Sequence, residues 1–221
     1  MNKTGSQLTC RLAEIFSFLV LLAFVPVLVS ATPLHGSAQK GDLDAIKAFI
    51  ADGGDVNSRD KEGMTLLHWA AIKGHTAVAE YLIDHGSDIS ARDSYGTTAL
   101  QMGIFGDEKI VKLLLDKGVE VNAQNDEGIT ALHLAALEGN EVITEWLIAK
   151  GADMNMKSLR NHITPLYWAA KKGHYAVVEL LISKGADINI RTRRGRTPLR
   201  AAIKKGHREV AELLWNHGAK E

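Results

Sequence analysis

A motif of the form Thr-x-Leu-His-x-Ala recurs along most of the chain. Residues 65–71 read TLLHWAA, residues 130–136 read TALHLAA, residues 164–170 read TPLYWAA and residues 197–202 read TPLRAA. Thr98 begins a more divergent copy, so that consecutive copies start 32–34 residues apart. A period of this length is typical of stacked supersecondary units, each of which buries its apolar face only against its neighbours. We therefore expect an array of repeats and not a single globular core.

Each repeat carries the signals of two helices. The threonine that opens the motif can cap the first helix, and a proline at the next position fits the first turn. Apolar triplets mark the second helix of several repeats, at residues 81–83, 113–115 and 180–182. A glycine follows each of these helices and suits the left-handed residue that ends a helix. Paired alanines in the first helices allow adjacent repeats to approach closely.

On these residues the chain resembles the ankyrin-repeat proteins over nearly all of its length beyond residue 31. The resemblance implies an all-α solenoid of about six helix-turn-helix repeats with β-hairpin loops. We place the repeats at about 32–62, 63–95, 96–127, 128–161, 162–194 and 195–221. It also implies a module that binds another protein, with no cofactor.

Two repeats depart from the pattern. In the third repeat Thr98 and Gly106 enclose one residue fewer than Thr65 and Gly74 do, and Gly103 stands where the fourth repeat has an alanine. Because glycine weakens a helix, we predict that this first helix is shortened or distorted and that the array is least stable there. The second departure is one extra residue in the hairpin at 157–161, after which His162 takes the usual glycine position.

The first 31 residues read as a secretory signal peptide. Lys3 and Arg11 precede an apolar run at residues 15–29, and small residues end the segment at Ala31. The run is shorter than the roughly 20 residues that cross a bilayer as a helix, which favours cleavage after Ala31 over retention as a membrane anchor. The one cysteine, Cys10, lies in this leader. We expect a periplasmic or secreted, bacterial protein whose mature form has no cysteine and no stable membrane span.

The residues that could serve in catalysis or metal binding are explained better by their structural positions in the repeat. Eight of the nine histidines occupy recurring positions: in the motif itself, after the glycine between the two helices, or before the glycine that ends the second helix. The resemblance implies that the motif histidines bond within and between repeats. Only His162 stands outside this pattern. We find no nucleophile motif, no phosphate-binding loop and no metal-ligand set. Trp69, Trp168 and Trp215 are assigned to the core. The sequence thus predicts no enzyme activity, no metal and no cofactor.

The resemblance implies that recognition residues lie at the ends of the first helices and on the hairpin tips. Ile72, Phe105 and Leu137 would form an apolar strip at the centre of the groove. The other positions carried over are mostly basic, namely Lys73, Tyr95, Arg160, Lys171, Lys172, Arg191, Arg193, Arg194, Arg196, Lys204 and Lys205.

Charge divides the chain into two halves despite a formal net charge of zero. Residues 32–156 hold 10 Lys and Arg against 20 Asp and Glu, a net −10, whereas residues 157–208 hold 13 against 2, a net +11. Each half keeps its own field when the halves are separated by more than the screening length of roughly 8 Å.

The leading hypothesis is an exported, monomeric protein that binds an acidic patch on another protein, as an inhibitor, immunity factor or accessory protein of a secreted or periplasmic enzyme. A second hypothesis is binding of an anionic envelope lipid or polysaccharide. A third is a structural array that associates head to tail. The leader, and the lack of stacking aromatic residues among the basic ones, argue against nucleic acid.

Overall fold

The computed structural model describes residues 33–221. The leader that we infer from residues 1–31 lies outside the described residues. Within the described range twelve helices follow in antiparallel pairs: α2 (Pro33–Lys40) with α3 (Leu43–Ala51), α4 (Leu66–Lys73) with α5 (Thr76–Asp84), α6 (Ala99–Gly103) with α7 (Glu108–Asp116), α8 (Ala131–Glu138) with α9 (Glu141–Ala149), α10 (Pro165–Lys172) with α11 (Tyr175–Ser183), and α12 (Pro198–Lys205) with α13 (Arg208–Asn216). The predicted all-α solenoid of six helix pairs is confirmed.

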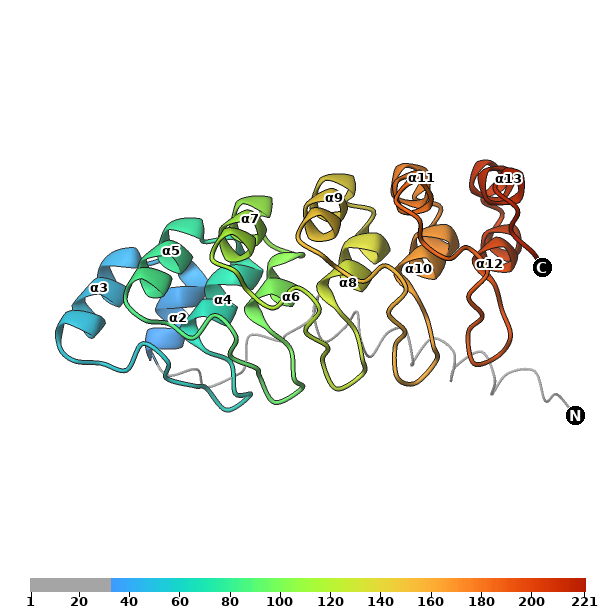
Figure 1. The fold of residues 1–221 in the computed structure, drawn as a ribbon. Helices are drawn as coiled ribbons and strands as arrows, with labels where there is room; N and C mark the ends of the chain where they lie inside the picture. Colours follow the sequence, from blue (N-terminus) through green and yellow to red (C-terminus); the bar gives the residue numbers. More distant parts are fainter. Residues whose placement is uncertain (1–32) are drawn as a thin grey trace, which may run out of the picture. The chain divides into compact units, whose positions relative to one another are not determined.

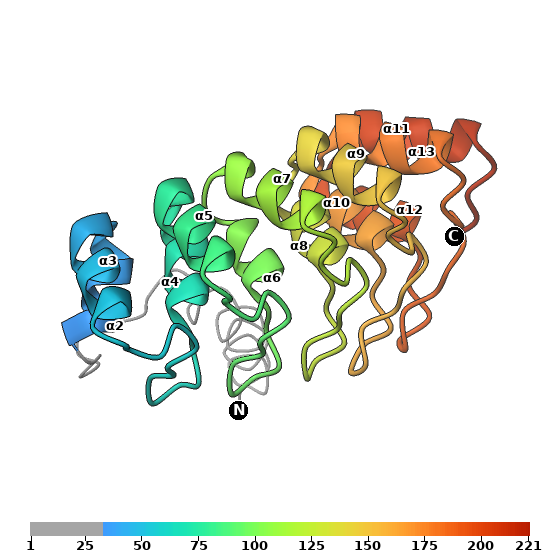
Figure 2. The ribbon, with the colours of Figure 1, turned by 60° about the vertical axis from the view of Figure 1, so that its left-hand side comes forward.

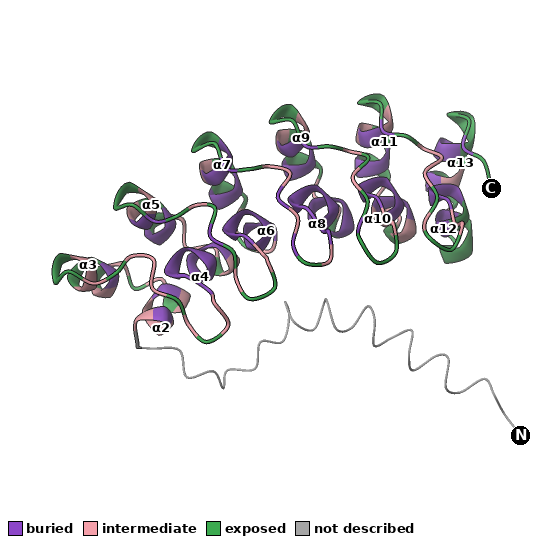
Figure 3. Ribbon diagram, turned by 60° about the horizontal axis from the view of Figure 1, so that its bottom comes forward, coloured by how far each residue is buried: buried purple, intermediate pink, exposed green. Residues whose placement is uncertain are grey.

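The helices form two rows, and loops project from one side of the array (Figures 1 and 2). The first helices of neighbouring repeats pack on one another, the second helices form the outer row, and the core lies between the rows (Figure 3). The paired alanines of α4, α8 and α10 are fully buried, as expected where helices approach closely. One part of this core joins α10, α11, α12 and α13 through residues that include Val177, Leu181, Leu199 and Leu214.

The loops are short hairpins held together in a ladder. Only isolated bridges, Arg59 with Thr65 and Arg92 with Thr98, mark them as β-like among the described residues. Backbone hydrogen bonds join each hairpin to the next, as from Ser94 N to Glu62 O at 2.9 Å and from Arg193 N to Asn161 O at 2.9 Å. The extra residue of the hairpin at 157–161 is accommodated by His162, whose φ of 52° lies in the left-handed region.

The motif histidines connect each repeat to the following hairpin. Nδ1 of His133 accepts from the backbone N–H of Thr130 at 3.2 Å, and Nε2 donates to the carbonyl of Ile163 at 3.0 Å. His68 makes the same contacts with Thr65 and Thr97, and Gln101 replaces them with its amide in the third repeat. This confirms the prediction that these side chains bond within and between repeats.

The residue after the turn between the two helices has one of two roles. In three repeats it is a histidine whose Nε2 donates to a carbonyl of the preceding repeat: His75 to Gln39, His174 to Leu137 and His207 to Lys171. In the third and fourth repeats, Asp107 and Asn140 instead cap their own second helices through Lys109 N and Ile143 N. The histidine contact to the preceding repeat is therefore absent on both sides of α6.

The third repeat has the shortened first helix that its sequence predicts. Helix α6 has five residues, whereas the other first helices have eight, and it contacts α8 less extensively than other neighbouring first helices contact one another. A Cβ at Gly103 would meet only ordinary contacts at 3.5 Å, but one at Gly106 would approach the carbonyl oxygen of Ala71 to 2.1 Å. Gly103 is therefore a weakness that the fold tolerates, and Gly106 is required by the close approach of α4.

Lower stability of the third repeat is our first prediction. Backbone amides of α6 should exchange hydrogen faster than those of α4 and α8, because α6 is short and holds a glycine. Gly103→Ala should slow this exchange and stabilise the repeat by about 0.5–1 kcal/mol. Gly106→Ala, the matched control, should speed exchange because its methyl group collides with Ala71. Equal protection of α4, α6 and α8 would contradict the prediction.

The second prediction concerns acid stability. Burial lowers the pKa of His133 to about 4, below the unfolded value of 6.5. The unfolded chain therefore binds more protons than the folded chain between these values, so that stability falls as the pH drops from about 6.5 towards 4. His133→Gln, which copies the residue found at Gln101 in the third repeat, keeps a donor and an acceptor but removes this titration.

Urea denaturation at about pH 7 and pH 5 should show that the wild type loses more stability than His133→Gln, by on the order of 2 kcal/mol. His68, whose pKa burial also lowers, is unchanged in both proteins and serves as an internal constant. An identical loss of stability in the two proteins would show that His133 is not held neutral.

Candidate functional site

The structure does not form the continuous apolar strip that the sequence predicts. Ile72 and Phe105 are half-buried, but Leu137 is only 6% exposed, so the expectation of an exposed side chain there is wrong. Helix α10 packs against this end of α8, and His174 bonds to the carbonyl of Leu137. The assignment of Trp215 to the core is also wrong, because this side chain is 62% exposed on α13.

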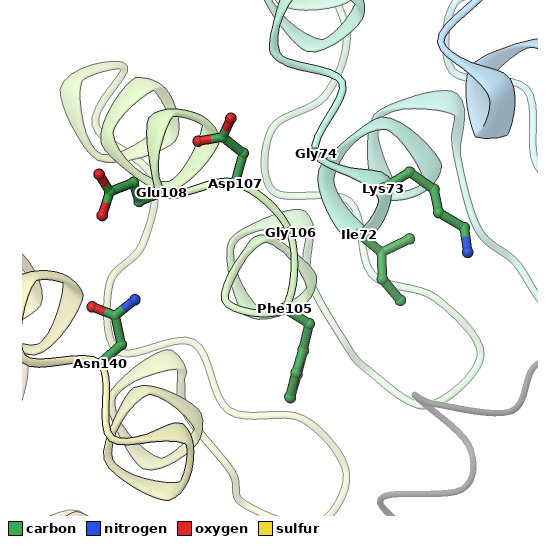
Figure 4. Close-up of a pocket in the computed structure, with 8 residues that line it drawn as sticks. All are labelled: Ile72, Lys73, Gly74, Phe105, Gly106, Asp107, Glu108 and Asn140. Atoms are coloured by element: carbon green, nitrogen blue, oxygen red, sulfur yellow. The ribbon is translucent and has the colours of Figure 1, made fainter.

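An open hollow of about 560 Å³ lies beside the third repeat (Figure 4). Its lining combines the two half-buried apolar residues with polar groups, namely Ile72, Lys73, Gly74, Phe105, Gly106, Asp107, Glu108 and Asn140. Ile72 and Phe105 lie on one side of it, and the carboxylates of Asp107 and Glu108 on the other. The hollow coincides with the turns that lack the histidine contact, so it is a consequence of the irregular repeat.

The hairpin arginines have different roles. Arg191 donates to the carbonyl of Gly195 at 3.0 Å and to that of Glu221 at 2.8 Å, as Arg59 and Arg92 do with their own and the following hairpins. Its guanidinium is thus engaged by the backbone. Arg160 pairs with Glu127 at 3.7 Å, and Tyr95 is 52% exposed on its hairpin tip. Arg191 is itself exposed, and only its alignment with Arg59 and Arg92 distinguishes it in the sequence from the arginines that bond to no backbone carbonyl.

Besides Arg191, seven of the predicted site residues lie on α10, α12 and the hairpin that joins α11 to α12. We call this set the basic surface, and it comprises Lys171, Lys172, Arg193, Arg194, Arg196, Lys204 and Lys205. No ion pair in the described structure involves any of them. The lysines of the preceding repeats differ, since Lys117 pairs with Asp84 at 2.9 Å and Lys150 with Asp116 at 3.1 Å. The basic surface therefore carries uncompensated positive charge.

Comparison with known proteins assigns the fold. A family model described as ankyrin repeats (three copies) matches residues 34–125, 105–192 and 132–221. The chain belongs to the ankyrin-repeat family. It is also similar to an ankyrin repeat domain from Acinetobacter baumannii AYE, whose crystal structure matches with 31% sequence identity and a TM-score of 0.75 over 85% of this chain and 98% of that one. A search of curated proteins found no match.

Ankyrin repeats are protein–protein interaction modules and are typically not enzymes. Within residues 33–221 no group of three or more His, Cys, Asp or Glu side chains is arranged to hold a metal ion. None of the described helices is both long and apolar enough to cross a membrane.

Lys171 is the most constrained member of the basic surface of this ankyrin array. Its side chain is half-buried, and its Nζ lies 4.4 Å from the centroid of the Trp168 ring. Burial, assisted by the positive charges of Lys205, Lys172 and Arg196, lowers its pKa to about 8. The positive charge is therefore less favourable at this position than in water, although the lysine is still mostly charged at neutral pH.

Trp168 is assigned to the core by its sequence position, but the structure places it at the edge. Trp69, its counterpart in the second repeat, is 4% exposed and donates its indole N–H to Asp60 at 2.8 Å. Trp168 is half-buried. Its indole Nε1 has no hydrogen-bond acceptor in the described structure, and the atom is accessible to solvent. The positions of the two tryptophans in the motif do not reveal this difference. The available signal lies in the hairpin, where Ser158 stands at the position of Asp60, the acceptor for the Trp69 indole.

Proposed function

We propose that this ankyrin-repeat protein binds a partner protein through the basic surface and the adjoining hairpin tips, and that the partner presents an acidic patch. The observation that carries the proposal is the set of seven cations on neighbouring elements without a carboxylate partner. Like charges gathered in this way repel one another, so an anionic partner relieves repulsion as well as adding contacts. Arg193 and Arg194, exposed on the hairpin tip, are suited to forked pairing with carboxylates.

The pattern of residues 1–31 supports export, and we propose a periplasmic or secreted site of action. An exported interaction module without a catalytic site is suited to act as an inhibitor, immunity factor or accessory protein of an enzyme in that compartment. This part of the proposal rests on the leader and on analogy within the family.

Charge reversal on the basic surface is the direct test. A variant with Lys171, Lys172, Arg193 and Arg194 changed to Glu should lose capture of a specific partner from envelope extract by about tenfold or more, because steering and contact charges both change sign. A matched control reverses Lys109, Lys184, Arg208 and Lys220, four exposed cations that lie outside the basic surface. Captured proteins are identified and quantified by mass spectrometry.

Equal capture by the wild type and both variants would contradict the proposed surface. Binding to heparin or to phosphatidylglycerol vesicles with a steep salt dependence, and without any protein partner, would instead support the anionic-ligand hypothesis.

A further inference from the structure

We propose that Trp168, Lys171, Arg196 and Lys205 form a subsite that receives the carboxylate of an Asp or Glu side chain from the protein partner. The subsite rests on the proposed function and specifies where and how the acidic partner is held. Two repeats of the same chain, the second and the fifth, carry a tryptophan at the same position of the first helix, and the difference between them points to the ligand.

In the second repeat the tryptophan already has a carboxylate. The indole N–H of Trp69 donates to Oδ2 of Asp60, while Oδ1 of Asp60 accepts from the backbone N–H of Met64 in the same hairpin. The carboxylate therefore satisfies the hairpin and the tryptophan together. Trp69 lies almost fully buried as a result of this arrangement and of its packing.

In the fifth repeat the corresponding carboxylate is missing. Ser158 takes the hairpin position of Asp60, and its Oγ accepts from the backbone N–H of Ile163 at 3.0 Å. The hydroxyl group thus satisfies the hairpin but supplies no acceptor to Trp168. The indole Nε1 remains open, and a ligand oxygen placed there would replace the oxygen that Asp60 provides in the second repeat.

The charges that act on Lys171, the residue over this indole ring, are those of cations. Lys171 on α10 lies over the Trp168 ring, with Lys172 beside it on the same helix. Lys205 of α12 and Arg196 of the preceding hairpin are near enough to act on the charge of Lys171. Glu138 ends the neighbouring helix α8 but forms no ion pair in the described structure, and the His207 side chain makes its hydrogen bond to the carbonyl of Lys171. A carboxylate is the complementary group for an N–H donor surrounded by ammonium and guanidinium groups.

The lysine is positioned before the ligand arrives. The contact between the Lys171 ammonium and the Trp168 ring holds the charge at one place, which reduces the side-chain entropy lost on binding. Burial, together with the charges of the neighbouring cations, lowers the pKa of Lys171, and a bound carboxylate raises it again. Binding at about pH 9, where the free lysine is largely neutral, should therefore take up as much as about one proton per ligand, whereas binding at about pH 6.5 should take up none.

The test uses the full repeat array and a Glu-rich peptide, with the matching Gln-rich peptide as a neutral control. Calorimetric titration in two buffers of different ionisation enthalpy measures both affinity and proton uptake. Lys171→Gln should weaken binding of the Glu-rich peptide by about tenfold, because a charge-assisted hydrogen bond is lost. Lys184→Gln, which removes the same charge from the outer row of helices, should change affinity by less than about twofold.

Two conservative variants separate the subsite from a general effect of charge. Lys171→Arg keeps the positive charge but does not titrate, so it should bind the peptide and abolish proton uptake at about pH 9. Trp168→Phe keeps an aromatic ring but removes the indole donor, and should weaken binding about threefold to tenfold. Thermal unfolding of each variant checks that the array remains folded.

The outcomes distinguish failure of the subsite from failure of the proposed function. If the wild type binds the Glu-rich peptide but Lys171→Gln and Trp168→Phe bind it equally well without a change in proton uptake, the subsite is wrong and the basic surface stands. If the wild type does not bind the Glu-rich peptide in preference to the Gln-rich one, both proposals fail. Competition by inorganic phosphate, or tighter binding of heparin or phosphatidylglycerol vesicles than of peptide, would overturn the assignment to a protein carboxylate.

Discussion

The hydrogen bonds of the motif histidines are the interaction on which the array depends. His68 and His133 each join the start of their own helix to the hairpin of the following repeat, and both are fully or almost fully buried. These histidines bond to backbone groups, which every residue has. The contacts therefore set the spacing of the repeats whatever side chains the neighbouring repeat carries. The hairpin ladder and the buried alanines reinforce the same spacing.

On α10 and α12, structural roles and surface charge are largely carried by different residues. Repeats are joined by histidines and backbone groups, and most cations of α10 and α12 are therefore not needed to hold the fold. These cations form no ion pair in the described structure, and their mutual repulsion is the basis of our proposal that the partner is negative. Uncharged threonines cap the first helices of five repeats, namely Thr65, Thr98, Thr130, Thr164 and Thr197.

Most of the fold could be predicted from the sequence because the residues that define the repeat also determine the local backbone conformation, above all where helices begin and end. Thr130 predicts a helix start and Gly139 a helix end, and the missing residue before Gly106 predicts the short helix α6. The same reasoning places His68 and His133 in inter-repeat contacts. These features depend on local backbone geometry, which a pattern of residue types specifies well.

Exposure is harder to predict because it depends on what the adjacent repeat places over a side chain. Leu137 is covered where α10 packs on α8, whereas Trp215 lies on the last described helix and no described repeat packs over it. Arg191 is occupied by backbone carbonyls that only the folded hairpins bring within reach. The open indole of Trp168 likewise depends on the hairpin geometry around Ser158.

The proposed binding of an acidic partner at the basic surface can be tested most directly by nuclear magnetic resonance. The isotope-labelled array is titrated with a Glu-rich peptide, so that every backbone amide reports its own environment. We expect the shifted amides to cluster on residues 165–172 and 193–205. Shifts concentrated on α4 to α7, or on the outer row of second helices, would contradict binding at the basic surface.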